Sequence, residues 1–187
     1  MSTTIDLIGS FIIGGLLLLV VLMAQGNLAQ NSYERTMDLI AQENMATLVE
    51  IFQHDVRKMG FGVPDSVEAV VAADSTSVIF LADLDANGSV DTVAYSVSDT
   101  SAASATENPR DRLFFRRVNG GPSGGITMGV TDFHLTYLDS SGSVTTTPAQ
   151  IRAVDIEISV ESLYPYDHRY ATATWEGTIR PRNLNLN

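Results

Sequence analysis

Five oxygen-bearing side chains recur at alternate positions in one short segment of the chain. The segment reads Asp-Leu-Asp-Ala-Asn-Gly-Ser-Val-Asp and ends at Asp91. Carboxylate and amide oxygens at this spacing, with a glycine at the sharp turn, allow a short loop to wrap Ca²⁺. The side chains that would bind the ion are Asp83, Asp85, Asn87, Ser89 and Asp91.

The same segment has a second interpretation that needs no metal. An EF-hand loop ends on a bidentate glutamate, and the corresponding residue here is Ala94. The flanking segments are predicted strands rather than helices, and an Asn-Gly pair between strands favours a tight hairpin turn. Two alternatives therefore stay open, a Ca²⁺ loop and a plain turn at Asn87-Gly88.

A second group of side chains with chemical potential is basic. Guanidinium groups beside aromatic rings are typical of surfaces that bind phosphate groups or single-stranded nucleic acid. Phe114 and Phe115 lie among the four arginines of this group, which are Arg110, Arg112, Arg116 and Arg117. The alternative is a solvated strand face whose charges are neutralised by nearby acids, and we expect nucleic acid not to be a partner.

Nothing in the sequence predicts catalysis. The histidines, His54, His134 and His168, lie far apart and lack the spacing of metal ligands. Nucleophile-elbow, phosphate-loop and zinc signatures are absent. We therefore expect a protein that is not an enzyme and has no cofactor other than Ca²⁺.

The composition limits the function further. The chain has 187 residues, 22 acidic and 11 basic side chains, a net charge of −11 and no cysteine. Sixteen acids against eight arginines after residue 62 give that part a net charge of −8. An acidic surface disfavours binding to nucleic acid or anionic membranes. Without cysteine, disulfides and c-type haem attachment are excluded.

The elements that position these groups begin with an apolar segment. No charged residue occurs from Leu7 to Ala24, and a helix of that length spans about 27 Å, close to a bilayer's hydrocarbon core. A cleaved signal peptide would need a basic flank, and Met1 to Asp6 has none. A single-pass anchor and a filament core stay as alternatives, and residues 1–25 form the first predicted unit.

Residues 26–62 continue this helix in amphipathic form. Apolar residues recur at spacings of mostly three and four, at Leu28, Tyr33, Met37, Ile40, Met45, Leu48, Phe52, Val56 and Met59. Polar residues, Asp55 among them, fill the other side, and Gly60-Phe61-Gly62 ends the helix. A helix from Ser2 to Met59 would be about 85 Å long.

Residues 63–187 are predicted to form a β-rich head. Alternating apolar and polar residues and polar turns predict strands over 67–72, 77–81, 89–97, 112–118, 132–138, 152–163 and 169–179. Ser98 to Asn108 is predicted to be a mobile loop, and Asn119 to Gly125 a glycine loop. Short connections favour an antiparallel sheet packed on the helix, an α+β fold.

The N-terminus resembles the mature N-terminus of type IV pilins and pseudopilins. In that family an acid follows a Thr-Leu-Ile pattern and precedes an apolar helix; Thr3, Ile5, Asp6 and Leu7 match it in type and spacing. The resemblance implies that Asp6 pairs with a neighbouring subunit's terminal amine. It places Asp6, Phe11, Gly14 and Gly15 in filament assembly. The departures are Ser2 for phenylalanine, aspartate for glutamate, and no visible leader peptide.

The head is similar to that of larger minor pilins. The resemblance lies in Asp83–Tyr95, Leu113–Gly120, Val130–Asp139 and the tail Arg180-Pro181-Arg182-Asn183-Leu184. It implies a bacterial structural subunit of a type IV pilus-like or pseudopilus filament, a homo-oligomer held by its apolar helices. It also implies an inner-membrane location before assembly and an extracellular one, at the cell surface, afterwards. The alternatives are a minor or priming pilin of a pilus or type II secretion system, and a monomeric membrane-anchored module that binds a cation or ligand.

Overall fold

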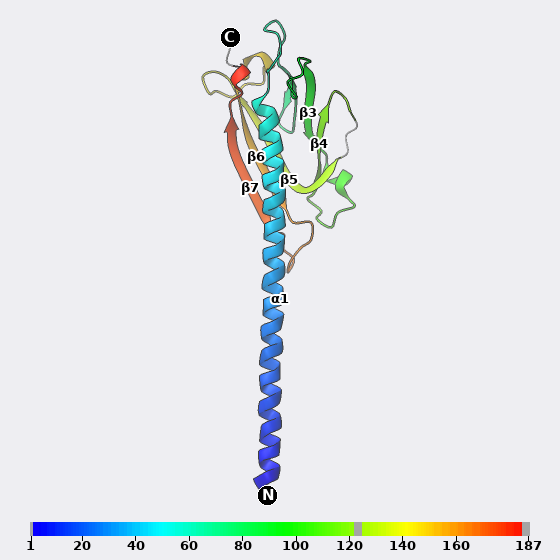
Figure 1. Ribbon diagram of the computed structural model, residues 1–187, viewed down its shortest axis with the longest axis vertical. Helices are drawn as coiled ribbons and strands as arrows, with labels where there is room; N and C mark the ends of the chain where they lie inside the picture. The colour runs from blue at the N-terminus through cyan, green and yellow to red at the C-terminus, as the bar shows by residue number, and fades with distance from the viewer. Residues whose placement is uncertain (1, 122–124, 185–187) are drawn as a thin grey trace.

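The computed structural model describes residues 2–121 and 125–184. One long helix, α1 (Ser2–Arg57), is followed by a seven-stranded antiparallel sheet (Figure 1). The strands are β1 (Val70–Asp74), β2 (Ser77–Ala82), β3 (Asp91–Val97), β4 (Arg112–Val118), β5 (Ile126–Leu138), β6 (Ala153–Glu161) and β7 (Thr172–Ile179). The short 3-10 helices are η1 (Thr100–Ala103), η2 (Pro148–Gln150) and η3 (Arg182–Leu184). This confirms the predicted α+β fold.

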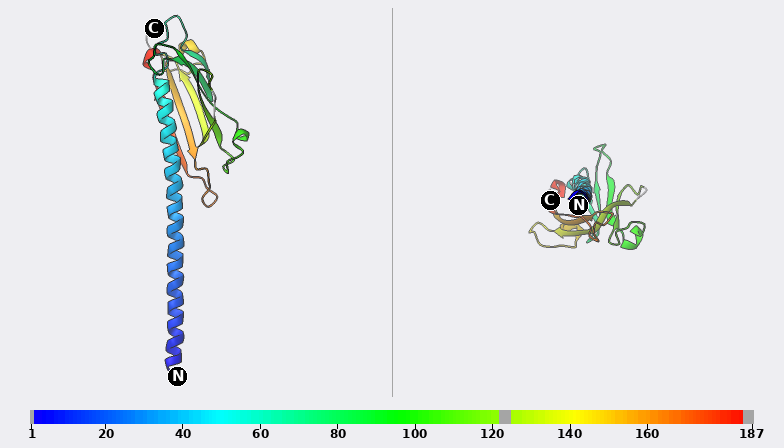
Figure 2. Two further views of the ribbon diagram at one scale, coloured as in Figure 1. Left: turned by 45° about the vertical axis from the view of Figure 1, so that its right-hand side comes forward. Right: turned by 90° about the horizontal axis from the view of Figure 1, so that it is seen from below.

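The two halves of α1 have different surroundings. Its first half projects beyond the head, and its second half lies along one face of the sheet (Figure 2). The large apolar side chains from Ile5 to Met23 are 51–74% exposed. Among the described residues, α1 is the one helix that is long and apolar enough to cross a membrane.

The end of α1 is fixed by two glycines. Gly60 and Gly62 adopt φ values of 82° and 73°, a left-handed conformation that residues with a side chain rarely adopt. The Gly60 N–H then donates to the carbonyl oxygen of Leu81 at 2.9 Å. The helix ends two residues before the predicted Met59, and the chain turns directly onto the sheet.

The sheet is a meander in which each strand pairs with the next one in the chain, from β1 to β7. β5 begins six residues before the predicted strand, because it continues past a register shift between Val130 and Asp132 to pair with β4. Gly129 precedes the shift at φ 73°, where an added Cβ would collide with the carbonyl oxygen of Glu161. This close approach explains why a glycine lies inside a strand.

The core lies between α1 and the sheet. The Phe52 ring meets Tyr95 and Phe133 edge-on, at centroid distances of 4.8 and 5.5 Å. Edge-to-face contacts of this kind add to the stabilisation from burial. Other buried members are Met45, Leu48, Val56, Met59, Phe80, Phe114, Ile156 and Ile158.

Several sequence predictions about packing were wrong. Leu28 and Tyr33 belong to the predicted stripe but are 68% and 41% exposed, because the buried part of α1 begins at Met37. Ile40, also in the predicted stripe, lies beyond that point and is 37% exposed, whereas its neighbour Ala41 is buried. Asp55 was predicted on the polar side but is 2% exposed, because β3 and β4 cover it. The predicted polar loop ending at Asn108 contains η1 and packs into the head, and Asn108 is buried. Part of the predicted glycine loop, residues 122–124, lies outside the described residues.

Candidate functional site

The acidic loop connects β2 to β3 and spans residues 83–90, which is longer than a two-residue Asn-Gly turn. Asp83, the first residue of the loop, and Asp91, the first residue of β3, are nearly buried, and Asp85 is exposed. Each of the three can place a carboxylate oxygen within 4.8 Å of the others. The fold thus brings together the three acids that the spacing predicted.

Donors from the chain already meet these carboxylates. The two Asp83 oxygens accept the backbone N–H groups of Asn87 and Gly88 at 3.0 and 2.8 Å. Asp91 accepts the Asn119 side-chain amide at 2.7 Å and the Leu84 N–H at 3.1 Å. These bonds hold the loop closed around the acids. Carboxylate oxygens that accept one hydrogen bond keep further lone pairs for a cation.

The other two predicted ligands are arranged differently. The Asn87 side-chain oxygen accepts the Ser89 N–H at 2.8 Å, and its amide donates to Asp85 at 2.8 Å. Asn87 therefore orders the loop itself. Ser89 is exposed. The carboxylates of Asp83, Asp85 and Asp91 form the candidate cation site.

The predicted arginine patch is divided among separate partners. Arg110 pairs with Glu161 at 2.8 Å, and Arg116 pairs with Asp55 at 2.7 Å. Arg112 donates to the backbone carbonyl oxygens of Thr131 and Ser98. Arg117, on the other side of β4 from Arg116, is exposed and stacks at 5.9 Å on the Phe115 ring. Three of the four arginines thus have structural partners within the chain.

Asp55 joins α1 to the sheet through a buried polar cluster. Its Oδ2 accepts from the Tyr95 hydroxyl at 2.6 Å and from Arg116 Nε at 2.7 Å. Burial opposes ionisation, but hydrogen bonds from Arg116, Tyr95 and His54 outweigh it and hold the pKa of Asp55 below its usual range. Sequence reasoning missed this cluster. Its one sequence signal is the position of Asp55 beside Val56 and three residues after Phe52, at the edge of the buried stripe.

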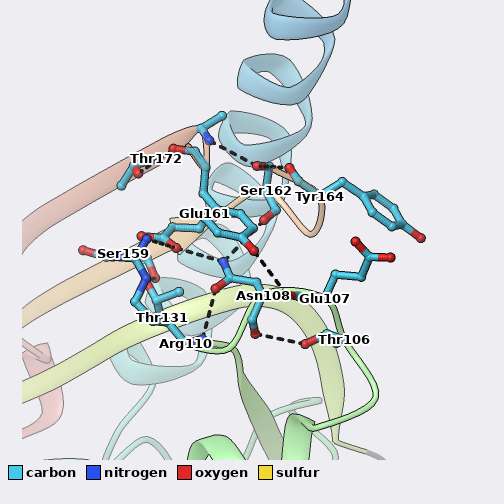
Figure 3. A network of polar contacts seen from close by, with 12 residues as sticks. Thr106, Glu107, Asn108, Arg110, Thr131, Ser159, Glu161, Ser162, Tyr164 and Thr172 are labelled. Atoms are coloured by element: carbon cyan, nitrogen blue, oxygen red, sulfur yellow. Dashed lines mark hydrogen bonds and ion pairs between the residues drawn. The ribbon is translucent and has the colours of Figure 1, made fainter. Parts of the chain in front are cut away.

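A second polar network closes the end of the head near β6 (Figure 3). The Asn108 side-chain amide donates to Glu161 Oε2 at 2.8 Å, and Arg110 reaches the same oxygen. Asp111, 1% exposed, lies beside this network, but none of the described residues donates a hydrogen bond to either of its oxygens. Burial, together with the negative charge of Glu161, raises the pKa of the Asp111 carboxyl and outweighs the opposing effect of the nearby Thr106 hydroxyl.

Replacing Asp111 by asparagine should stabilise the protein at pH 7 by about 1–3 kcal/mol, because a buried carboxylate without donors is removed. Since the folded-state pKa is raised, ionised Asp111 costs stability above that pKa, and the cost disappears as pH falls through it. We therefore expect the advantage of Asp111→Asn to shrink between pH 7 and about pH 4 in urea unfolding. Asp65→Asn is the exposed control. A variant of unchanged or lower stability at pH 7 would contradict this account.

The predicted assembly residues lie on the projecting half of α1. Asp6 and Phe11 are exposed, and Phe11 is 74% exposed. A Cβ added to Gly14 or Gly15 would meet no atom within 4 Å. Within the described part of the chain, the Asp6 carboxylate has neither a hydrogen bond nor an ion pair. These residues make no contact that holds the head together.

Comparison of the chain with family models, curated proteins and solved structures returned no match.

Proposed function

We propose that this chain is a pilin-like structural subunit that assembles into a helical filament through the projecting half of α1. The observation that carries the proposal is the exposed apolar surface between Ile5 and Met23. Water cannot stably solvate a surface of this size, so it must be covered by lipid or by other chains. Its length fits a bilayer, and its uniform apolarity fits a bundle of identical helices.

The division of α1 supports the same proposal. The sheet covers the second half of the helix, so the head keeps its core whichever partner covers the first half. A subunit can then move from the membrane to a filament without unfolding its head. The resemblance of the N-terminus and the head to pilins supports an inner-membrane location before assembly and an extracellular one afterwards. The proposal assigns no catalytic residue.

Electron microscopy of material sheared from producing cells tests this function. We expect thin filaments composed mainly of this chain, with the intact mass of the subunit measured in the same fraction. Filaments built mainly from another protein, with this chain present in small amounts, would favour a minor or priming subunit. If the chain stays wholly in the membrane fraction, the filament proposal is wrong.

The convergence of Asp83, Asp85 and Asp91 favours one additional role, Ca²⁺ binding by the head. Because the apolar residues before Gly26 contribute nothing to the core, a fragment of residues 26–187 should fold alone. At a hundredfold excess over its dissociation constant, Ca²⁺ stabilises by about 2.7 kcal/mol, which raises the unfolding midpoint of a chain this size by roughly 5–10 °C. We expect this shift to be lost in Asp85→Ala and kept in Asp65→Ala. Equal midpoints in Ca²⁺ and in chelator would leave the loop as a structural turn.

A further inference from the structure

A cavity of about 370 Å³ lies between the last turn of α1 and the end of β7. Its lining residues are Gln53, Arg57, Thr178, Ile179, Arg180 and Arg182. We name this the arginine pocket. It lies where the end of α1 meets the C-terminal part of the chain, at the far end of the molecule from the N-terminus (Figure 1). Three guanidinium groups therefore surround one hollow that no acidic residue lines.

Among the residues that the structure describes, the arginines of this pocket have no partner of opposite charge. Arg57 donates to the neutral amide oxygen of Gln53 at 3.1 Å, and its place in the last turn of α1 suits the helix dipole. Arg180 and Arg182 are exposed, and neither side chain forms a hydrogen bond or ion pair within residues 2–121 and 125–184. Ile179 and Pro181, which alternate with them, are buried. This alternation holds both arginines on the outer side.

The chain also carries an unpaired acidic site. Glu157 on β6 and Glu176 on β7 are directly opposite each other in register, and both are exposed. Like charges in directly opposed positions destabilise a sheet. His134 lies opposite Glu157 on β5, but neither glutamate side chain has a hydrogen bond or ion pair among the residues the structure describes. They lie on the face of the sheet away from α1, because their neighbours Ile156 and Ile158 are in the core.

The two sites have the charges needed for a contact between different copies of the chain. The head has a net charge of −8, so heads at filament spacing repel one another unless groups of opposite sign meet. Subunits in a bundle of parallel helices all point the same way, so their contacts are heterologous, and heterologous contacts build helical assemblies. The three guanidinium groups and the two carboxylates, none of which has an oppositely charged partner among the described residues, are complementary for such a contact.

We propose that the arginine pocket of one copy receives the Glu157–Glu176 pair of a second copy. This contact rests on the proposed filament function and specifies how the heads meet. Bidentate guanidinium–carboxylate pairing would relieve the repulsion within both sites at once. The contact is also directional, because the two sites lie at different places on each head.

Zero-length crosslinking of the full chain tests this contact. The chain has one lysine, Lys58, whose amine donates to the Leu84 carbonyl oxygen at 2.6 Å and is half-buried. An Arg182→Lys variant therefore adds the one freely accessible lysine that carbodiimide can couple to a carboxylate. The exposed Arg117→Lys is the matched control. Mixing copies with and without ¹⁵N separates links between chains from links within one chain.

We expect an intermolecular link from residue 182 to Glu157 or Glu176, about tenfold more abundant than any link from residue 117, and lost in Glu157→Gln/Glu176→Gln. Peptide mapping separates it from links made by the terminal amine. Filaments without this link, or with residue 182 linked to other acids, overturn the contact but leave the filament function intact. The link in membranes without filaments supports the contact and overturns the filament function. If neither the link nor filaments are found, both the contact and the filament function are wrong.

Discussion

Replacing Asp6 by alanine should abolish filaments while leaving the head folded. The Asp6 side chain is exposed and makes no contact with the head, so its loss does not change the stability of the fold. In a bundle of apolar helices the same carboxylate would be desolvated and would need a cationic partner, which the resemblance identifies as a neighbour's terminal amine. Removing one partner of a buried pair costs about 3–5 kcal/mol, so we expect filament yield to fall at least about a hundredfold.

Two variants make the Asp6 experiment specific. Asp6→Glu keeps the charge and should retain filaments, whereas Asp38→Ala removes an exposed acid from the part of α1 beside the head and should have no effect. Yield is measured by electron microscopy and by the amount of chain in the sheared fraction, and folding by circular dichroism. Filaments of Asp6→Ala at the parent level would contradict this prediction and show that assembly does not depend on the Asp6 carboxylate.

Replacing Asp55 by alanine should destabilise the head by about 3 kcal/mol, the lower end of the range for breaking a buried pair. The lower end applies because the Arg116 side chain is 36% exposed, so solvent screens part of its charge. Urea unfolding of the fragment 26–187 measures the effect, and Tyr95→Phe should cost less, about 1–2 kcal/mol, since it removes one hydrogen bond. A loss below about 1 kcal/mol for Asp55→Ala would show that the cluster contributes little.

The pH dependence of this variant has a definite sign. The folded-state pKa of Asp55 lies below its ordinary value of 3.8, so its contribution is fully present above that value and is lost as pH falls through the folded pKa. The parent and Asp55→Ala should therefore converge in stability below about pH 3.8. Asp111 has the opposite effect. Burial raises the pKa of its carboxyl, so lowering the pH protonates it and removes the destabilisation caused by its buried charge.

Local patterns predicted most elements of the fold. β4 occupies residues 112–118 as predicted, because its apolar and aromatic run is bounded by polar turns. The two halves of α1 could be told apart in the sequence. Apolar residues occupy nearly every position of the first half, whereas in the second half they recur at spacings of three and four residues. The extent of burial was not predictable. Whether Tyr33 or Met37 is covered depends on how far the sheet reaches down the helix, which no local pattern records.

The candidate sites likewise differ in how far the sequence alone could predict them. Asp83, Asp85 and Asp91 lie within nine residues of sequence, so a spacing rule could find them. The arginine pocket joins Arg57 to Arg180 and Arg182 from opposite ends of the chain. From the sequence, Asp55 has the pattern of an ordinary surface acid on an amphipathic helix. Only the folded structure shows that Tyr95 and Arg116 contact it. Sites formed by tertiary contacts between distant segments therefore cannot be predicted from local sequence patterns.

The meander has a consequence for the order in which the protein folds. Each strand pairs with its immediate predecessor, so hairpins can form one after another as the chain is synthesised. α1 is made first, yet it packs chiefly against β5, β6 and β7, which are made last. The apolar face of the helix around Leu48 and Phe52 therefore stays exposed to solvent until these last strands have been synthesised. During that interval the nascent chain is exposed to chaperones and proteases.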